Sequence, residues 1–383
     1  MRIEIKEKKD CCGCAACFNV CPQNCISMRQ DTEGFTYPVI DTDKCINCGL
    51  CSQVCPVKNA KPSIEGSPDA YACINLDENM RLKSSSGGMF ILFARKILEG
   101  KGTVYGAAFN SDASVSHIKI DKQEELWKVL GSKYLQSNIS STYKSVKEDL
   151  NTGKAVLFSG TPCQCAGLKE YLADDYKNLY LIDFICHGVP SPAVWLEYLR
   201  ALELKTGHMR DNEKAPSFRD KTKGWIHFML KIPFQDTVPY HQKFRNDLYM
   251  MTFLKNISLR PSCYDCKFKP STDISDITLG DFWGIKKCLP EMFDDKGTSA
   301  VLANSPKGKK LLEEVAEQTR SKQVTYGLIA RHNSSLNHSA QVPAMRKIFF
   351  EGFRKDNILE LMQKCTKESF IKRCIRALLR RLR

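Results

Sequence analysis

The sequence of 383 residues is long enough for two or three domains, and a hydrophobic content of 43% suits an ordinary buried core. Nineteen cysteines would fit a disulfide-rich secreted protein, but such proteins are short, and the charged residues 1–10 do not resemble a signal peptide. The formal charge of +14 comes without a nucleic-acid-reading motif, and no apolar stretch reaches the length of a membrane span. We therefore expect a cytoplasmic protein that binds no nucleic acid.

Two cysteine runs of identical spacing lie near the start of the chain. Each reads Cys-x2-Cys-x2-Cys-x3-Cys-Pro, over residues 11–22 and 45–56. This spacing is typical of two-cluster ferredoxins, in which the first three cysteines of one run bind one 4Fe–4S cluster and the fourth reaches the other cluster. A structural zinc site needs neither the third spacing nor the proline. The sequence predicts two 4Fe–4S clusters with the ligands Cys11, Cys14, Cys17, Cys21, Cys45, Cys48, Cys51 and Cys55.

Residues 1–60 are predicted to form the cluster-binding head, an α+β unit of the ferredoxin-like kind. Between the two runs, residues 34–40 read as part of a short strand pair. Two cysteines fall outside the ligand spacing: we expect Cys12 to point away from the cluster and Cys25 to be a core thiol. Residues 61–69 are rich in Pro, Ser and Gly, and are predicted to be a linker.

From residue 70 the pattern alternates between strands and helices. This alternation predicts an α/β sheet with helices on its faces, within a domain that we place at residues 70–340. The expected strands cover 71–74, 103–109, 155–159, 178–185, 225–232 and 276–279, and the expected helices cover 88–99, 164–172 and 192–204.

A second group of cysteines lies within this α/β region. Cys163 follows a turn after one strand, Cys186 ends the next strand, and Cys263 and Cys266 form a Cys-x2-Cys pair. Because turns at strand ends gather at one edge of such a sheet, these four cysteines can converge, with Cys165 in reserve. On spacing alone, a third 4Fe–4S cluster, a zinc site and scattered core thiols are all open.

Two further features of the α/β region are candidates for chemistry. The segment 84–88, Ser-Ser-Ser-Gly-Gly, opens a predicted helix and can offer backbone N–H groups to a phosphate, although the pattern alone favours an ordinary serine N-cap. His187 follows Cys186 and is a weak candidate for a catalytic proton donor; the alternative is a histidine that hydrogen-bonds within its loop.

Residues 341–383 form a basic tail, with twelve Lys and Arg against four Asp and Glu. Apolar residues at helical spacing near the end of the chain predict a basic amphipathic helix there. Such a helix can dock peripherally on an anionic membrane or on a partner, or it can pack on its own domain.

Several segments together resemble one family, the coenzyme F420 (deazaflavin) hydrogenase/dehydrogenase beta subunits. The resemblance covers about residues 1–290. The segments that carry it are Ser85–Phe90, Gly131–Tyr134, Gly160–Gln164, Ile185–Ser191, Arg219–Lys221 and Asp276–Gly284.

The resemblance implies an FAD beside a 4Fe–4S cluster in the α/β domain. It favours the third cluster on Cys163, Cys186, Cys263 and Cys266 over zinc. It also implies that FAD contacts lie in the Ser/Gly loop and at a nearby lysine, namely Ser85, Ser86, Gly87, Gly88 and Lys133.

The sequence thus predicts an iron–sulfur flavoprotein oxidoreductase. Single electrons would come from a ferredoxin or from a hydrogenase- or dehydrogenase-type subunit, and a flavin would convert them to a hydride for an organic acceptor. By resemblance the acceptor is a deazaflavin, and an intermediate of polysaccharide biosynthesis is the other candidate. The alternative function is a non-catalytic electron relay without flavin.

Overall fold

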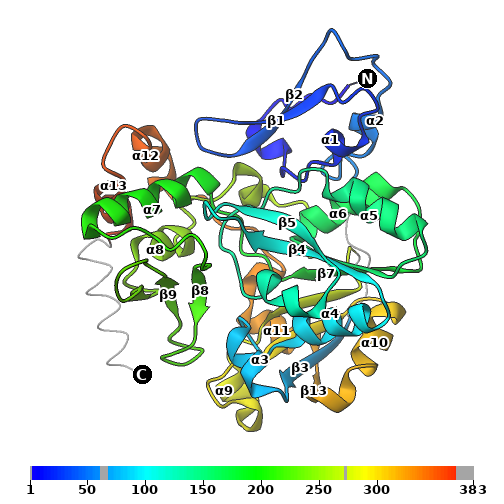
Figure 1. Ribbon diagram of the computed structural model, residues 1–383, viewed down its shortest axis with the longest axis vertical. Coiled ribbons are helices and arrows are strands. Elements are labelled where there is room, and N and C mark those ends of the chain that lie inside the picture. Colours follow the sequence, from blue (N-terminus) through cyan, green and yellow to red (C-terminus); the bar gives the residue numbers. More distant parts are fainter. Residues whose placement is uncertain (1, 61–67, 271–273, 368–383) are drawn as a thin grey trace.

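The computed structural model describes residues 2–60, 68–270 and 274–367. The head has two antiparallel strands, β1 (Ile26–Gln30) and β2 (Thr36–Ile40), and two short helices, α1 (Ala16–Val20) and α2 (Leu50–Gln53). Figure 1 shows the head at the top, resting on the remainder of the chain beside α5 and α6.

The body is built on one mixed sheet of eight strands in the order β13-β3-β12-β11-β7-β6-β4-β5. β4, β6, β7 and β11 run parallel, β12 is antiparallel to both β11 and β3, and β5 and β13 close the edges in antiparallel pairs. The strands are β3 (Asp69–Asn75), β4 (Thr103–Phe109), β5 (Val115–Ile120), β6 (Val156–Ser159), β7 (Leu179–Phe184), β11 (Ile277–Asp281), β12 (Ser299–Ala303) and β13 (Thr319–Val324).

Helices cover both faces of this sheet. Successive side chains of a strand point to opposite faces, and apolar side chains lie on both faces, so both must be buried. Leu157 of β6 packs in one buried cluster with α4 and α10, whereas Val156 and Phe158 pack in another with α5 and α6. The helices of the sheet are α3 (Glu78–Lys83), α4 (Met89–Glu99), α5 (Thr142–Asn151), α6 (Pro162–Leu172), α9 (Ile285–Cys288), α10 (Pro306–Glu313) and α11 (Tyr326–His332).

A lobe beside the sheet contains the three-stranded sheet β10-β9-β8 and four helices. Its core includes Trp195, Tyr249, Phe349 and Met362, so the described part of the basic tail, residues 341–367, is packed into this core. Residues 368–383, where the amphipathic helix was expected, lie outside the described residues. The elements are α7 (Pro192–Thr206), β8 (Ser217–Asp220), β9 (Met229–Ile232), β10 (Tyr240–Lys243), α8 (Leu248–Leu254), α12 (Met345–Gly352) and α13 (Ile358–Thr366).

The predicted strand over residues 225–232 is only half right. β9 begins at Met229, and Trp225 is held outside it, because its backbone N–H donates to Asp295 O (2.7 Å) and its ring Nε1 donates to Asp281 Oδ1 (2.8 Å). The antiparallel strands β5, β12 and β13 were not predicted. Within the described ranges, no helix is long and apolar enough to cross a membrane.

The direction of the strands decides where the functional residues meet. β3, β4, β6, β7 and β11 all point the same way, so their carboxyl ends lie at one edge of the sheet, here called the carboxyl edge. In open α/β sheets this edge is where ligands bind. Cys163 and Cys186 follow strands that end there, and the Ser/Gly loop follows β3 and the short helix α3.

The head docks on the body through polar and apolar contacts. Asn19 Nδ2 donates to Ser140 O at 2.8 Å, and the guanidinium of Arg346 binds the Glu33 carboxylate at 3.0 and 2.6 Å. Cys14 packs in the same buried cluster as α5 and α6. The close approach depends on Gly167 in α6, since an added Cβ would lie 2.8 Å from Cys14 Cβ.

Replacing Gly167 by alanine should therefore destabilise the protein, although alanine in a helix interior usually stabilises by about 1 kcal/mol. The new methyl group would overpack the interface and cost about 1–3 kcal/mol, lowering the unfolding temperature in a thermal melt. The matched control is Gly327→Ala in α11, where nothing lies within 4 Å of the added Cβ. Equal stability of the two variants would contradict this account of the interface.

Candidate functional site

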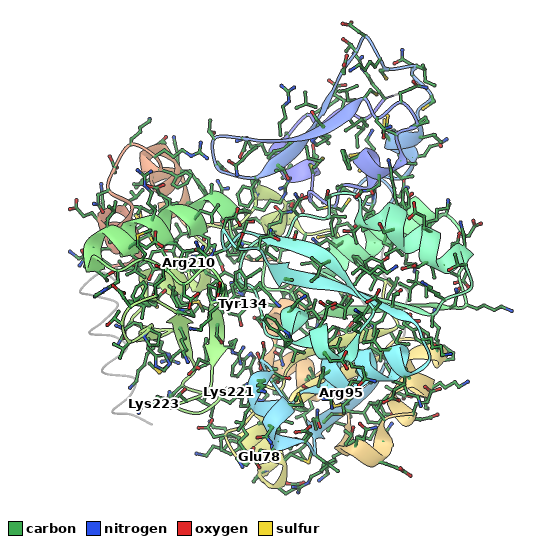
Figure 2. The ribbon with its side chains drawn as sticks, in the orientation of Figure 1. Glu78, Arg95, Tyr134, Arg210, Lys221 and Lys223 are labelled. Atoms are coloured by element: carbon green, nitrogen blue, oxygen red, sulfur yellow. The ribbon has the colours of Figure 1, made fainter. Side chains whose placement is uncertain are left out.

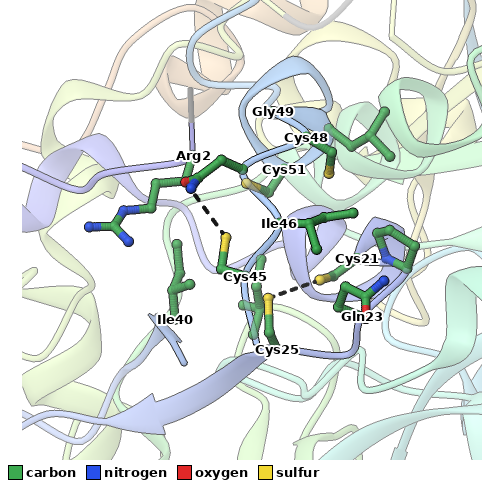
Figure 3. Close-up of a pocket in the computed structure, with 14 residues that line it drawn as sticks. Arg2, Cys21, Gln23, Cys25, Ile40, Cys45, Ile46, Cys48, Gly49 and Cys51 are labelled. Carbon is green, nitrogen blue, oxygen red and sulfur yellow. Dashed lines mark hydrogen bonds between the residues drawn. The ribbon is translucent and has the colours of Figure 1, made fainter. Parts of the chain in front are cut away.

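Two cavities of similar size lie within the head. One is lined by Cys21, Cys45, Cys48 and Cys51. Figure 3 shows these four cysteines around the cavity, with Cys25 beside Cys21. Here it is called the distal cage. In each head cavity, three cysteines come from one run and the fourth from the other, which is the crossed grouping of a two-cluster ferredoxin.

The second head cavity, here called the proximal cage, lies nearer the body. It is lined by Cys11, Cys14, Cys17 and Cys55. Burial and the nearby Cys11 and Cys55 thiolates raise the pKa of Cys17 to about 12. Four thiolates this close repel one another, so the cage suits a positively charged iron–sulfur core that offsets their charge.

Within the described ranges, no group of three or more His, Cys, Asp or Glu side chains is arranged to hold a metal ion. A cubane places four iron atoms between its ligands, so its thiolates stand around a volume instead of converging on one point. Cys25, the expected core thiol, is buried, and its sulfur lies 3.3 Å from Cys21 Sγ.

A third cavity brings together the predicted cysteines of the body. Cys163 lies at the start of α6, Cys186 follows β7, Cys263 lies in a short helix (Pro261–Asp265) and Cys266 follows that helix. All four line the cavity. They meet because β6 and β7 are parallel neighbours whose carboxyl ends coincide. The reserve candidate Cys165 does not line this cavity; it is fully buried, and its sulfur faces the Gly160 and Ile182 carbonyls.

Cys12, expected to point away from the cluster, has a position between head and body that was not predicted. It lines both the proximal cage and the third cavity, is 6% exposed, and its thiol contacts those of Cys14 and Cys163. The only signal in the sequence was that Cys12 directly follows the ligand Cys11. Side chains of neighbouring residues point in different directions, so Cys12 would face another part of the protein. Cys12 is therefore the point at which the head cage and the body cavity touch.

His187 also lines the third cavity, but both of its ring nitrogens already have partners. Nε2 lies 2.6 Å from Asn256 Oδ1, and Nδ1 lies 3.4 Å from Ser335 Oγ. Burial lowers the pKa of His187, which favours the neutral ring. Both partners belong to distant segments of the chain, so His187 joins its loop to two other segments, and its role as a proton donor stays a prediction.

The Ser/Gly loop lies at the same carboxyl edge, beyond β3. The N-cap of α4 is Gly88 in the left-handed region, and no side chain caps this helix, so the ordinary serine N-cap was the wrong alternative. Ser85 Oγ instead accepts from the Ser132 N–H at 2.7 Å, and Ser86 Oγ donates to Thr298 O at 2.9 Å. The first backbone N–H groups of α4 thus lack a side-chain partner, as an anion site requires.

Lys133 lies in the segment that crosses this loop. Its ammonium donates to the carbonyls of Leu130 (2.8 Å) and Lys128 (3.3 Å), and no carboxylate of the described chain pairs with it. Desolvation by burial lowers the pKa of Lys133 to about 7. Nearby His117 is buried, donates its Nε2–H to Ser159 O (2.9 Å), and has a pKa lowered by burial to about 4.

Three more residues at the carboxyl edge, Tyr134, Arg219 and Lys221, lie in segments that carry the family resemblance, but they were not predicted as site residues. Arg219 binds Asp281 through two hydrogen bonds of 2.7 and 3.0 Å and donates to Tyr134 OH at 3.1 Å. Lys221 donates to three carbonyls, including that of Ser86 at 2.7 Å. Figure 2 shows Tyr134 and Lys221 where the lobe of β8 and β9 meets the eight-stranded sheet.

Comparison with known proteins gives two family matches. Residues 153–325 match the family model for the C-terminal part of the beta subunit of coenzyme F420 hydrogenase/dehydrogenase, and residues 10–59 match the 4Fe-4S dicluster domain. No curated protein matches the sequence. A solved structure, a xenon derivative of the F420-reducing NiFe hydrogenase complex from Methanosarcina barkeri, is similar with a TM-score of 0.48 and 14% identity, covering 72% of this chain and 91% of that one.

Proposed function

We infer the function of this chain from its family, because the chain belongs to the coenzyme F420 hydrogenase/dehydrogenase beta subunits and carries an N-terminal 4Fe–4S dicluster domain. The family is part of an oxidoreductase, and its 4Fe–4S domain transfers electrons. We propose that the chain is an iron–sulfur flavoprotein that exchanges single electrons with a ferredoxin or partner subunit and hydride with an organic substrate.

The observation that carries this proposal is the continuity of the three cysteine cavities. The proximal cage adjoins the third cavity through Cys12, and the third cavity opens from the carboxyl edge that also holds the Ser/Gly loop. Cys163, Cys186, Cys263 and Cys266 would hold a third 4Fe–4S cluster there. The cluster ligands thus form an unbroken series from the head to the sheet edge.

The carboxyl edge has the features that an anionic aromatic cofactor needs. The uncapped start of α4 and the Lys133 ammonium can bind phosphates. Ten buried side-chain polar atoms of the described chain have no hydrogen-bond partner, among them His117 Nδ1 and Arg219 Nε. We assign FAD contacts to Ser85, Ser86, Gly87, Gly88 and Lys133. FAD, when bound, supplies the exchange between single electrons and a hydride.

The family supports a deazaflavin as the organic substrate, and a polysaccharide-pathway intermediate is a second acceptor to test. The electron donor would dock near the distal cage, where Cys48 is exposed and Cys45 is half-buried. Peripheral membrane contact through residues 368–383 is a separate proposal, on a segment outside the described residues.

The decisive experiment is anaerobic purification followed by reconstitution with iron, sulfide and FAD. We expect about twelve iron atoms per chain, FAD released on denaturation, and reduction of the bound flavin by a reduced ferredoxin. About eight iron atoms with one zinc would assign zinc to the third cavity. A protein that holds its iron but no FAD would be the electron relay, and this result would overturn the proposed flavoprotein.

Replacing Lys133 by glutamine should weaken FAD binding about tenfold, because a charged hydrogen-bond donor to a phosphate is lost. In the native chain, Lys133 is protonated below its pKa of about 7 and binds the anion best there, so FAD affinity should fall as the pH rises above 7. His117 stays neutral over this range. Fluorescence titration of FAD measures both effects, and Lys128→Gln, an exposed neighbour paired with Glu125, is the control. If FAD affinity depends on pH in the same way in Lys133→Gln as in the unaltered protein, Lys133 is not part of the FAD site.

A further inference from the structure

Arg260 is a fully buried arginine at the junction between the head and the body. Its side chain is 0% exposed. The guanidinium donates to Cys11 O (2.8 Å), Gln136 Oε1 (2.9 Å) and Thr36 O (3.0 Å), and its NH2 lies 3.5 Å from Cys11 Sγ. These partners are carbonyl oxygens and a thiol, so within the described chain the hydrogen bonds of this buried cation include no carboxylate.

The described chain has three other buried arginines. Arg210 donates to the Asp211 and Ser111 carbonyls and has carboxylates nearby, the first of them that of Glu203, and the other two bind carboxylates directly. Arg81 binds Asp294 and Arg219 binds Asp281, each through two hydrogen bonds. Such pairing is favoured, because an uncompensated buried charge costs several kcal/mol. Among the described residues, the acidic groups that act most on Arg260 are the Cys11, Cys12 and Cys263 sulfurs and the Tyr37 hydroxyl. The nearest is Cys11 Sγ at 3.5 Å, which would be a thiolate as a cluster ligand.

The loop of the proximal cage is shaped around Arg260. Gly13 has φ +72°, and a Cβ added there would lie 2.9 Å from the Arg260 guanidinium and 2.6 Å from Gln136 Nε2. Gln136 Nε2 donates to Cys12 O at 3.0 Å. Arg260 does not line the proximal cage but lies directly behind its loop, against Cys11. The distal cage has one cation among its lining residues, Arg2, which is exposed.

Arg260 is also tied to the third cavity. Its carbonyl accepts from the Cys263 N–H at 2.9 Å, and its N–H donates to Val189 O at 3.0 Å. Both Cys263 and Val189 line that cavity. One residue therefore holds the backbone of the proximal cage with its side chain and the backbone of the third cavity with its main chain.

We propose that Arg260 is a positioning residue whose buried charge takes the cluster of the proximal cage as its counter-ion and raises the reduction potential of that cluster above that of the distal cluster. A cubane with four thiolates carries about −2 when oxidised and about −3 when reduced, so a fixed neighbouring cation favours the reduced form. This inference rests on the proposed function for its direction: an electron from a reduced donor protein reduces the distal cluster, which is reoxidised as the proximal cluster takes the electron.

The test is a redox titration of the full-length reconstituted protein, followed by the electron paramagnetic resonance signals of the reduced clusters. In Arg260→Gln, the one-electron equilibrium of one head cluster should shift at least tenfold toward the oxidised form, about 59 mV, while the other head cluster is unchanged. Arg260→Lys keeps the positive charge, so the reduction potential of that cluster should stay close to its value in the unaltered protein. A Cys48→Ser background, which alters the distal cluster, should leave the Arg260 shift in place.

A second variant tests the effect of the Arg260 charge without removing the arginine side chain. Gln136→Glu has almost the same shape and gives Arg260 its own carboxylate, so it should lower the potential of the same cluster. The docking control is Arg346→Gln, which breaks the Glu33 pair between head and body but is not bonded to any cluster cysteine. It should leave both potentials unchanged.

Three results would overturn the proposal. They are equal shifts of both clusters in Arg260→Gln, no shift in either Arg260→Gln or Gln136→Glu, and an Arg260→Lys shift as large as that of Arg260→Gln. Failure of the proposed function is distinguishable, because it would appear as missing FAD or missing iron in the unaltered chain. The potentials of the two head clusters can be measured whether or not flavin is present.

Discussion

Replacing Cys263 and Cys266 together by serine should remove about four of roughly twelve iron atoms from the reconstituted protein. Both cysteines line the third cavity, and without them only Cys163, Cys186 and Cys12 are left there. Three thiols cannot complete the four-thiolate ligand set of a cubane, whereas the two head cages keep all of theirs.

The measurement is colorimetric iron together with the resonance spectrum of the reduced protein, which should retain two interacting head clusters. Cys288→Ser is the matched control, since Cys288 is half-buried and lies near His332, away from the three cavities. Unchanged iron in the double variant would take these residues out of the cluster site. A loss of one zinc with no loss of iron would assign the cavity to zinc.

Replacing Asp281 by alanine should cost about 3–5 kcal/mol of stability, because it leaves the Arg219 guanidinium buried without its carboxylate. The Arg219 and Asp281 side chains are 3% and 14% exposed. Asp281 also accepts from Trp225 Nε1, so its loss leaves a second buried donor unpaired. Burial opposes the charge of Arg219, but Asp281 and Tyr134 raise its pKa, and it stays protonated at any pH where the protein folds.

Urea denaturation measures this change. Glu78→Ala is the control, since its pair with Lys296 is exposed and should contribute less than about 1 kcal/mol. The double variant Asp281→Ala with Arg219→Leu should recover part of the loss, because the unpaired charge is gone. If the double variant is no more stable than Asp281→Ala alone, the buried charge is not the cause of the instability.

The fold of the body was predictable where the pattern was local. The strand over 103–109 and the helices that begin near residues 89 and 192 follow from apolar periodicity and from prolines and glycines at their ends. β12 and β13 were missed because β12 is a short apolar run between loops and β13 has mostly exposed side chains. Their strand identity comes from pairing with β3, which no local window contains.

Parts of the candidate site, too, could be predicted from local sequence, whereas other parts depend on the tertiary structure. The spacing of the cysteine runs predicts the ligand type, and the crossed grouping is visible in the two head cavities. The convergence of Cys163, Cys186 and the Cys263–Cys266 pair was an inference from strand ends, and the structure places all of them around one cavity. The rejection of Cys165 required knowing which side of α6 faces the sheet.

By itself, the sequence determined the chemistry of the head, because cluster ligation depends on residue type and on spacings of two and three residues within one loop. Only the tertiary structure decided which cage faces the body, that Cys12 joins that cage to the third cavity, and that Arg260 lies between them. The physical reason is distance along the chain: Arg260 and Cys11 are 249 residues apart. A contact of that span arises from the packing of whole domains, and no local pattern encodes it.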